Sequence, residues 1–458
     1  MSQLVMLFSL FCFWRLIKKD IADRDGVSTA IWIPTLWVGI LLSRPVSLWL
    51  NFGGGDDSLE GSPVDRLFYF GTILAALVVL QRRKISWPQI ISQNWPIMLF
   101  YGFFLLSIVW APSPFVAFKR WFKDFGNVSI ALVILTEVNP LQAFRAVFVR
   151  CSYVLMPLSV VFVRYFPDLG RRYSRSGGLE ITGVTTQKNA LGVLVLVCGL
   201  VLIWDWLERT KPGSAARGRL ERFLPALFFL IGVYLLHLCN SMTATLSLIF
   251  GAAILMTSRI PFARQRIGTI GFLVLGAIIA FFALDSLFHV KDAFLQMVGR
   301  DPTLTGRTEV WDRLLSLHTD PIFGDGFCSF WSDKRYLSQL PYWIGASAHN
   351  GYLEVYLDGG FLGLFFLGIV LLATGYRVSR HLPDGSNYAL IRFAVFVAII
   401  IEDVSESNWG RMSSLGFIFL LTAIGYAERG DLVSIPASVA AGDNPEESED
   451  FQGTTVSS

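Results

Sequence analysis

Long apolar runs separated by short polar connectors set the pattern of this chain. The runs lie near 3–15, 30–49, 66–81, 95–111, 126–138, 146–166, 189–205, 223–239, 242–258, 267–284, 360–376, 389–404 and 411–427. Crossing a hydrocarbon core takes about 20 apolar residues as helix, because the backbone must hydrogen-bond internally there. The pattern therefore predicts an all-α polytopic integral membrane protein with about 12–13 transmembrane helices.

The charges of the connectors predict which way the helices run. Connectors rich in Lys and Arg alternate with connectors that are not, and by the positive-inside rule the basic ones face the cytoplasm. This places one set of loops on the opposite side, at 51–65, 112–125, 167–188, 285–359 and 405–410. We expect one membrane domain over 1–427, which includes the large periplasmic loop 285–359, and a disordered acidic cytoplasmic tail over 428–458.

Several basic residues on the outward loops oppose this topology. They are Lys119, Arg120 and Lys123, then Arg171, Arg172, Arg175 and Lys188, and in the large loop Arg300, Arg307, Arg313, Lys334 and Arg335. Outward positive charge works against the favoured orientation and invites a functional reason. A phosphate or pyrophosphate substrate would supply one. The alternative is that these residues pair with nearby Asp side chains or meet lipid headgroups.

Composition excludes several other classes of protein. The chain is 53% hydrophobic and 16% charged, and its net charge of +3 gives no reason to expect a nucleic-acid partner. The five cysteines and five histidines are dispersed, so neither a disulfide framework nor a metal site is expected. The first apolar run lacks a basic start and a cleavage site, which favours a first span over a cleavable signal peptide.

The large outer loop carries the candidate chemistry. Helical spacing after Gly306 puts Val310, Leu314 and Leu317 on one stripe, next to Arg307 and Trp311. Ser347 is expected to cap a second helix, with His349 in its first turn. The helix dipole would there disfavour imidazolium, leaving His349 able to accept a proton, and the exposed amides would help to hold an anion.

Aromatic residues crowd the same loop. They are Trp311, Trp331, Tyr336, Tyr342, Trp343 and Tyr352. Such rings pack on sugars, although they would also suit a belt at the membrane interface. Together with His349 and Arg307 they favour a glycan site.

These motifs resemble the O-antigen ligase and polymerase superfamily of bacterial membrane glycosyltransferases, which includes exopolysaccharide polymerases. The resemblance rests on their order along the chain. It begins with GVTTQKNALG at 183–192 and continues with Gly306-Arg307-Thr308, Trp311, Pro321, Gly324-Asp325-Gly326, His349-Asn350, Tyr352-Leu353-Glu354, Gly359, Gly360 and Gly363.

The resemblance implies transfer of a glycan from undecaprenyl pyrophosphate to an acceptor hydroxyl at the periplasmic face of the inner membrane. His349 matches the proposed catalytic base and Arg307 an arginine that engages the pyrophosphate; no metal or other cofactor is implied. Polysaccharide assembly and export proteins are possible partners, and membrane lipids surround the chain. Trp311 is expected to contact the sugar. Asn350 and Glu354 are lesser candidates for substrate binding, and with Glu406 they are expected mainly to orient neighbours.

One position departs from the family pattern. Ligases of the family commonly carry a Ser-Arg pair where this chain has Ser241-Met242-Thr243. We expect Lys188 or Arg175 to supply the missing charge, which favours a polymerase slightly over a ligase.

A polysaccharide flippase or transporter is the alternative function. Ion-coupled carriers usually place ionisable residues at the membrane midplane. Here Asp205, His237, Glu402 and Asp403 lie near the ends of the predicted spans. The sequence therefore favours an enzyme that works at one face.

Overall fold

The computed structural model describes most of the chain. The described residues are 2–22, 24, 26–52, 62–83, 85–174, 177–211, 218–257, 259–260, 266, 307–317, 319–341, 344–382, 387–409 and 412–425. They belong to one compact unit, Met1–Tyr426. The expected tail at 428–458, the apolar run at 267–284 and the loop residues 285–306 lie outside the described residues, as do Tyr342 and Trp343.

Helices make up nearly all of the regular structure within this part of the chain. Their bounds are α1 Ser2–Ala22, η1 Thr29–Ile31, α2 Trp32–Leu41, α3 Val46–Trp49, α4 Pro63–Arg82, α5 Trp87–Gln93, α6 Trp95–Ser107, η2 Ile108–Trp110, α7 Pro114–Leu135, α8 Pro140–Tyr165, α9 Pro167–Gly170, α10 Lys188–Arg209, α11 Arg219–Cys239, α12 Met242–Thr257, α15 Arg307–Leu315, η3 Phe330–Ser332, α16 Lys334–Leu337, α17 Gly351–Arg380, α18 Asn387–Glu402 and α19 Ser414–Ala423. The strands β1 Arg171–Tyr173 and β2 Leu179–Ile181 form a small antiparallel hairpin.

The predicted all-α membrane architecture is confirmed. Five helices in the described residues are long and apolar enough to cross a membrane: α4, α8, α10, α11 and α17. A sixth span is added if α5 and the helix that follows it, bent by 86°, count as one. Each predicted apolar run within the described residues overlaps a helix, although the run at 30–49 is divided between α2 and α3 by Arg44-Pro45.

The expectation of a loop at 112–125 is wrong. Pro114 begins α7, a position where the fixed φ of proline suits the first helical turn, and no glycine or proline follows until Gly126. Lys119, Arg120 and Lys123 therefore project from a helix. Long basic side chains can keep their charge near water while their stems cover apolar surface, so charge alone does not end a helix there.

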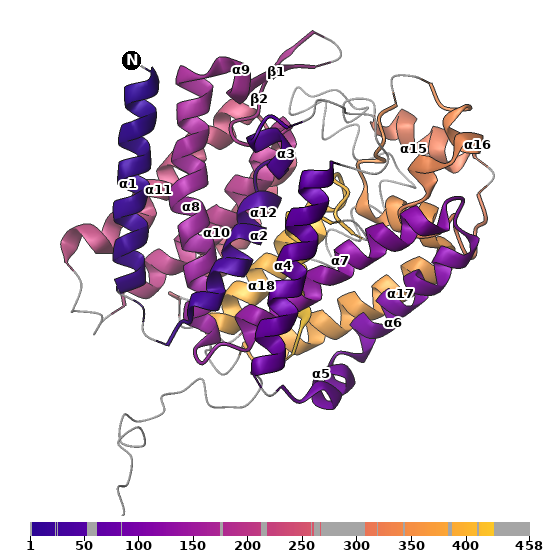
Figure 1. The fold of residues 1–458 in the computed structure, drawn as a ribbon, viewed down its shortest axis with the longest axis horizontal. Coiled ribbons are helices and arrows are strands. Elements are labelled where there is room, and N and C mark those ends of the chain that lie inside the picture. Colours follow the sequence, from indigo (N-terminus) through magenta and orange to yellow (C-terminus); the bar gives the residue numbers. More distant parts are fainter. Residues whose placement is uncertain are drawn as a thin grey trace, which may run out of the picture. The chain divides into compact units, whose positions relative to one another are not determined.

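The interior of the bundle is built around α8 and α10. Both are buried over most of their apolar length, whereas α4 is largely exposed and offers its apolar side chains to lipid. Figure 1 shows α1 and α8 side by side, and α6 lying along α17, and the contacts between these helices agree.

A break in α17 joins the outer loop to the membrane helices. Gly360 has φ 59° and ψ −158°, so the regular helix hydrogen bonds are interrupted there. The amides of Phe361 and Leu362 instead donate to the carbonyls of Pro321 and Ile322, at 2.8 and 3.2 Å. On the other side of the break, the carbonyls of Leu357 and Asp358 accept from the amides of Asp325 and Gly326. The Gly324-Asp325-Gly326 turn is thus held in the kink.

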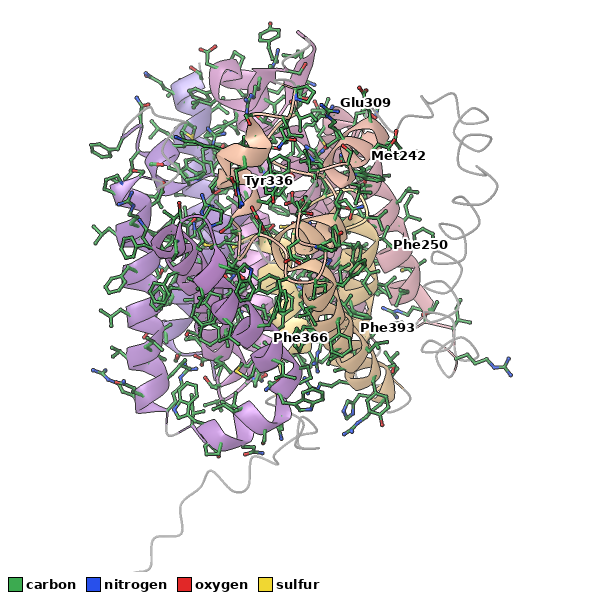
Figure 2. The ribbon with its side chains drawn as sticks, turned by 90° about the vertical axis from the view of Figure 1, so that its right-hand side faces the viewer. Met242, Phe250, Glu309, Tyr336, Phe366 and Phe393 are labelled. Carbon is green, nitrogen blue, oxygen red and sulfur yellow. The ribbon has the colours of Figure 1, made fainter. Side chains whose placement is uncertain are left out.

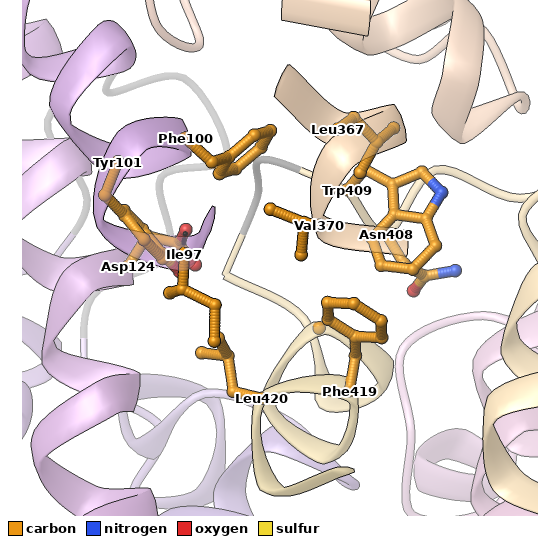
Figure 3. A pocket seen from close by; sticks show the side chains of 11 residues that line it. Ile97, Phe100, Tyr101, Asp124, Leu367, Val370, Asn408, Trp409, Phe419 and Leu420 are labelled. Carbon is orange, nitrogen blue, oxygen red and sulfur yellow. Dashed lines mark hydrogen bonds between the residues drawn. The ribbon is translucent and has the colours of Figure 1, made fainter. Parts of the chain in front are cut away.

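A small cavity lies beneath the segment that joins α18 to α19. Figure 3 shows its lining, in which Asp124 and Tyr101 face Asn408 and Trp409 across apolar side chains of α6, α17 and α19. Its volume is about 30 Å³. This is room for about one or two water molecules, so the cavity cannot hold a sugar or a polyprenyl chain.

Replacing Gly360 with alanine should destabilise the protein. A Cβ at this position would overlap the backbone of Ile322, and alanine is strained at a positive φ. We expect Gly360→Ala to lower the free energy of unfolding by roughly 2–4 kcal/mol, read as a lower thermal unfolding midpoint in detergent. Gly368→Ala, in the same helix with open space around its Cβ, is the control and should be neutral or slightly stabilising. Equal midpoints for the two variants would contradict the described kink.

Candidate functional site

The segment 403–407, between α18 and α19, is where the starts of several helices meet. Gly351 at the start of α17 donates its amide to the carbonyl of Asp403 at 2.8 Å. The hydroxyls of Thr243, at the start of α12, and Ser405 lie 2.5 Å apart. Figure 2 shows Met242 on α12 and Glu309 on α15 at the same end of the bundle. The starts of α12 and α17 therefore both bond to this short segment.

Glu406 brings together the two residues that carry the predicted chemistry. Its Oε1 accepts from Arg307 Nη2 at 2.8 Å and from Asn189 Nδ2 at 2.7 Å. Its Oε2 lies 3.5 Å from His349 Nδ1. Arg307 also donates to the carbonyl of Ser405. One carboxylate thus joins α10, α15 and His349, which lies two residues before α17.

The electrostatics of Glu406 follow from these partners. Burial raises the pKa of its carboxyl, but His349 and Arg307 oppose this effect and leave the pKa below its ordinary value. Glu406 is therefore ionised at neutral pH. A fixed negative charge beside Nδ1 favours the tautomer that carries its proton there, leaving Nε2 as the acceptor.

His349 does not occupy the first helical turn that the sequence predicts. Asn350 is the N-cap of α17, and its side chain accepts from the amides of Tyr352 and Leu353, both at 3.0 Å. His349 precedes it with φ 49°, in the left-handed region, and the hydroxyl of Ser347 accepts from the His349 amide. Serine and asparagine are both favourable N-cap residues, and in this structure Asn350 rather than Ser347 caps α17. The His349 side chain is 38% exposed.

The expected anion contact with the amides at the start of α17 is also wrong. The amides of Gly351, Tyr352, Leu353 and Glu354 already donate to Asp403 or to Asn350. The start of α10 differs, because its N-cap Gln187 makes no capping hydrogen bond through its side chain. This start carries Lys188 and Asn189, next to Glu406, so the positive end of α10 faces the site.

Lys188 and Arg175 were the candidates for the missing positive charge. Lys188 pairs with Glu180 at 3.4 Å and its side chain is 44% exposed, so its ammonium remains accessible from the start of α10. Arg175 lies outside the described residues. Other outward basic residues have structural partners, since Arg120 donates to Cys328 and Ser332, and Arg335 pairs with Asp333.

Glu354 is placed to organise the loop rather than to touch a substrate. It is only 1% exposed. Its Oε1 accepts from the Ala348 amide at 2.6 Å and from the Ser407 hydroxyl at 3.2 Å, and its Oε2 accepts from Trp331 Nε1 at 2.8 Å. These bonds fix the chain on both sides of His349.

The aromatic residues of the loop divide into two groups. Trp331 and Tyr336 are buried in a small core with Leu314, Leu317 and Leu357, so they have no free face for a sugar. This core includes the predicted stripe of α15. Trp311 is half-buried and donates from Nε1 to the carbonyl of Ala348 at 2.8 Å, one residue from His349. Trp311 is therefore held beside His349.

Sequence reasoning missed the part played by Asn189, Ser405 and Ser407. Ser407 accepts from the Asn350 amide at 3.2 Å and bonds Ser347 and Glu354. The sequence signal that could have identified the serines was a polar Ser-Glu-Ser at 405–407 between two apolar runs.

Among the described residues, no group of three or more His, Cys, Asp or Glu side chains could hold a metal ion.

Changing Glu354 to glutamine should loosen the loop around His349. A glutamine nitrogen would face at least one donor that the carboxylate accepts, leaving a buried group unpaired. We expect a loss of about 1–3 kcal/mol in loop stability, measured as faster limited proteolysis and a lower unfolding midpoint. Glu309→Gln, at an exposed position of α15, is the control and should behave as wild type. Unchanged proteolysis of Glu354→Gln would contradict its assigned role.

Comparisons with known proteins agree with the motifs. A family model described as O-antigen ligase matches residues 226–368, a segment that includes Arg307 and His349. The chain is 22% identical over 359 residues to the exopolysaccharide production protein ExoQ of Rhizobium meliloti (strain 1021), covering 75% of this chain and 78% of that protein. No solved structure matches the chain. The two matches confirm the resemblance of this membrane protein to the O-antigen ligase and polymerase superfamily.

Proposed function

We propose that this protein transfers a glycan from a polyprenyl pyrophosphate carrier to an acceptor hydroxyl during polysaccharide biosynthesis. A ligase- or polymerase-type role is supported by the O-antigen ligase match and by ExoQ. The carrier and the mechanism are our inference from the site. The observation that carries it is the sharing of Glu406 between Arg307 and His349.

His349 is the proposed general base. A sugar hydroxyl is a poor nucleophile until a base takes its proton. His349 Nε2 accepts this proton, while Glu406 beside Nδ1 stabilises the imidazolium that results. The acceptor oxygen then forms a bond to the anomeric carbon of the donor glycan, and the bond from that carbon to the pyrophosphate oxygen breaks. The leaving group is the polyprenyl diphosphate.

Positive charge at the site suits this leaving group. Negative charge develops on the pyrophosphate oxygen as its bond breaks, and donors fixed in advance stabilise it. Arg307, Lys188 and the uncapped start of α10 are the groups we assign to this task. They perform it without a metal ion, so transfer should persist in EDTA. Arg175 is a further proposed contact, Trp311 a contact to the sugar, and Asn350 and Glu354 hold His349 in place.

The proposed setting is the bacterial inner membrane, with the site at the periplasmic face and the C-terminus in the cytoplasm. A carrier lipid would reach the site sideways from the outer leaflet. A polymerase is favoured slightly over a ligase, because Met242 stands where ligases of the family carry arginine. Polysaccharide assembly and export proteins are the proposed partners.

Loss of either central residue should abolish transfer. With purified protein and a carrier-linked glycan, we expect His349→Ala and Arg307→Ala to lower the rate by at least about 100-fold. Exposed residues of the same types supply the controls, His237→Ala for the histidine and Arg313→Ala on α15 for the arginine. Wild-type rates for both site variants, at equal yield of inserted protein, would refute the assignment.

Deletion of the gene should reveal which transfer is made. Surface and secreted glycans would be resolved by chain length, with wild type and His349→Ala as complements. Products one repeat long indicate a polymerase, whereas full-length chains left on the carrier indicate a ligase. Repeats trapped on the cytoplasmic side would favour a flippase and overturn the proposed reaction.

Glu406 should act as a positioning residue for Arg307 and His349. Its carboxylate accepts from Arg307 and lies beside His349 Nδ1, so Glu406→Gln should reduce the maximal rate about 10- to 100-fold. Asn189→Ala removes another hydrogen bond of Glu406 but keeps the charge, so its maximal rate should fall much less. Equal losses of rate in the two variants, at equal unfolding midpoints, would contradict a role for the charge of Glu406.

A further inference from the structure

The first turns of α7 carry basic residues whose environments differ. Arg120 is turned to the outer loop, where it donates to the carbonyl of Cys328 and to the hydroxyl of Ser332. Lys119 and Lys123, four residues apart, lie on one face of the helix. Both are half-buried, and their ammonium groups lie over aromatic rings: Lys119 is 4.7 Å from the centre of Phe115, and Lys123 is 5.0 Å from the centre of Tyr69 on α4.

Lys123 has no hydrogen-bond acceptor or ion-pair partner among the residues that the structure describes. Two carboxylates lie in its neighbourhood, and both have other partners. Asp65 accepts from the amide and hydroxyl of Ser47, at 3.0 and 2.6 Å. Asp124 accepts from the Tyr101 hydroxyl at 3.1 Å and from Asn127 Nδ2 at 3.0 Å. An ammonium group has three donors, and a ring face satisfies them incompletely.

The surface around these lysines is the kind that lipid chains cover. Exposed apolar side chains flank them on both helices: Phe115, Phe118 and Phe122 on α7, and Leu67, Phe70 and Leu74 on α4. A ligand here would therefore meet positive charge and aromatic rings on the first turns of α7, and exposed apolar side chains further along α4. Such a division of charge and apolar surface matches a lipid with an anionic head.

We propose that Lys119 and Lys123 form a binding site for the phosphate of an anionic phospholipid, whose acyl chains lie along the exposed face of α4. The phosphate oxygens accept from the ammonium groups, and the aromatic rings keep the two side chains extended toward the head. This site is separate from Glu406 and does not rest on the proposed glycan transfer.

The test is lipid retention measured by native mass spectrometry. The full-length protein would be titrated with phosphatidylglycerol, and with phosphatidylcholine as the zwitterionic comparison. We expect one phosphatidylglycerol to be retained in preference to phosphatidylcholine. Lys123→Gln should weaken this binding about fivefold, the effect of one basic residue near a lipid phosphate, and Lys119→Gln should do the same. Lys123→Arg should retain the lipid, and Lys334→Gln, which removes an exposed charge from the outer loop, should leave binding unchanged.

Three outcomes would overturn the site. Equal retention by wild type and a double Lys119→Gln, Lys123→Gln variant would show that the lysines do not bind the head. Equal retention of the two lipids would remove the role of charge. Displacement of the lipid by millimolar inorganic phosphate would show a site for a free anion. Unfolding midpoints identify a variant that fails to fold. If the glutamine variants fail, retention of the two lipids is compared between Lys123→Arg and wild type, and loss of the preference for phosphatidylglycerol in Lys123→Arg would contradict the site.

Discussion

The negative charge of Glu406 is the constraint on which the outer end of the structure depends. A buried carboxylate is costly unless cations and hydrogen-bond donors surround it. Glu406 obtains them from three places in the sequence, through Asn189, Arg307 and His349. Each partner gives up some freedom to satisfy the same anion. As a result, Arg307 and His349, which lie far apart in the chain, are both held against one carboxylate.

The two ends of the bundle differ in how their carboxylates are paired with basic side chains. At the end where α8 and α10 approach their basic connectors, Asp20 pairs with Arg24 and Arg150, and Asp205 pairs with Arg145 and Arg209. These carboxylates sit between guanidinium groups and fix the helices to one another. At the Glu406 end one carboxylate faces Arg307 and His349, with Lys188 exposed nearby. Positive charge there is left accessible, which suits the anionic substrate that we propose.

Sequence patterns predicted the helices well because membrane crossing imposes a length and an apolar content that can be counted. The stripe Val310, Leu314 and Leu317 was predicted for the same reason, since periodicity reports which face is buried. Local cap choice was not predictable, because Ser347 and Asn350 are both suitable and tertiary contacts with Asp403 and Ser407 decide between them.

The role of Glu406 was harder still. The sequence marked it only as a residue that would orient its neighbours, since its partners lie about 57 to 217 positions away in the chain. Aromatic content also misled, because composition cannot distinguish Trp331 inside the loop core from Trp311 beside His349. The periodicity of apolar residues does not show which distant segments meet in space. The candidate site forms where such segments meet.

The kink of α17 has a consequence for how substrates come and go. Four backbone groups of the helix, two amides after Gly360 and two carbonyls before it, have their partners in the turn at 321–326. Lifting the loop away like a lid would strand these groups at the edge of the hydrocarbon, at a cost of several kcal/mol. We therefore expect the loop to stay in place during the proposed reaction. Donor and acceptor would then reach the site from beneath the loop, and lateral diffusion of lipid, not the opening of a lid, would limit their access.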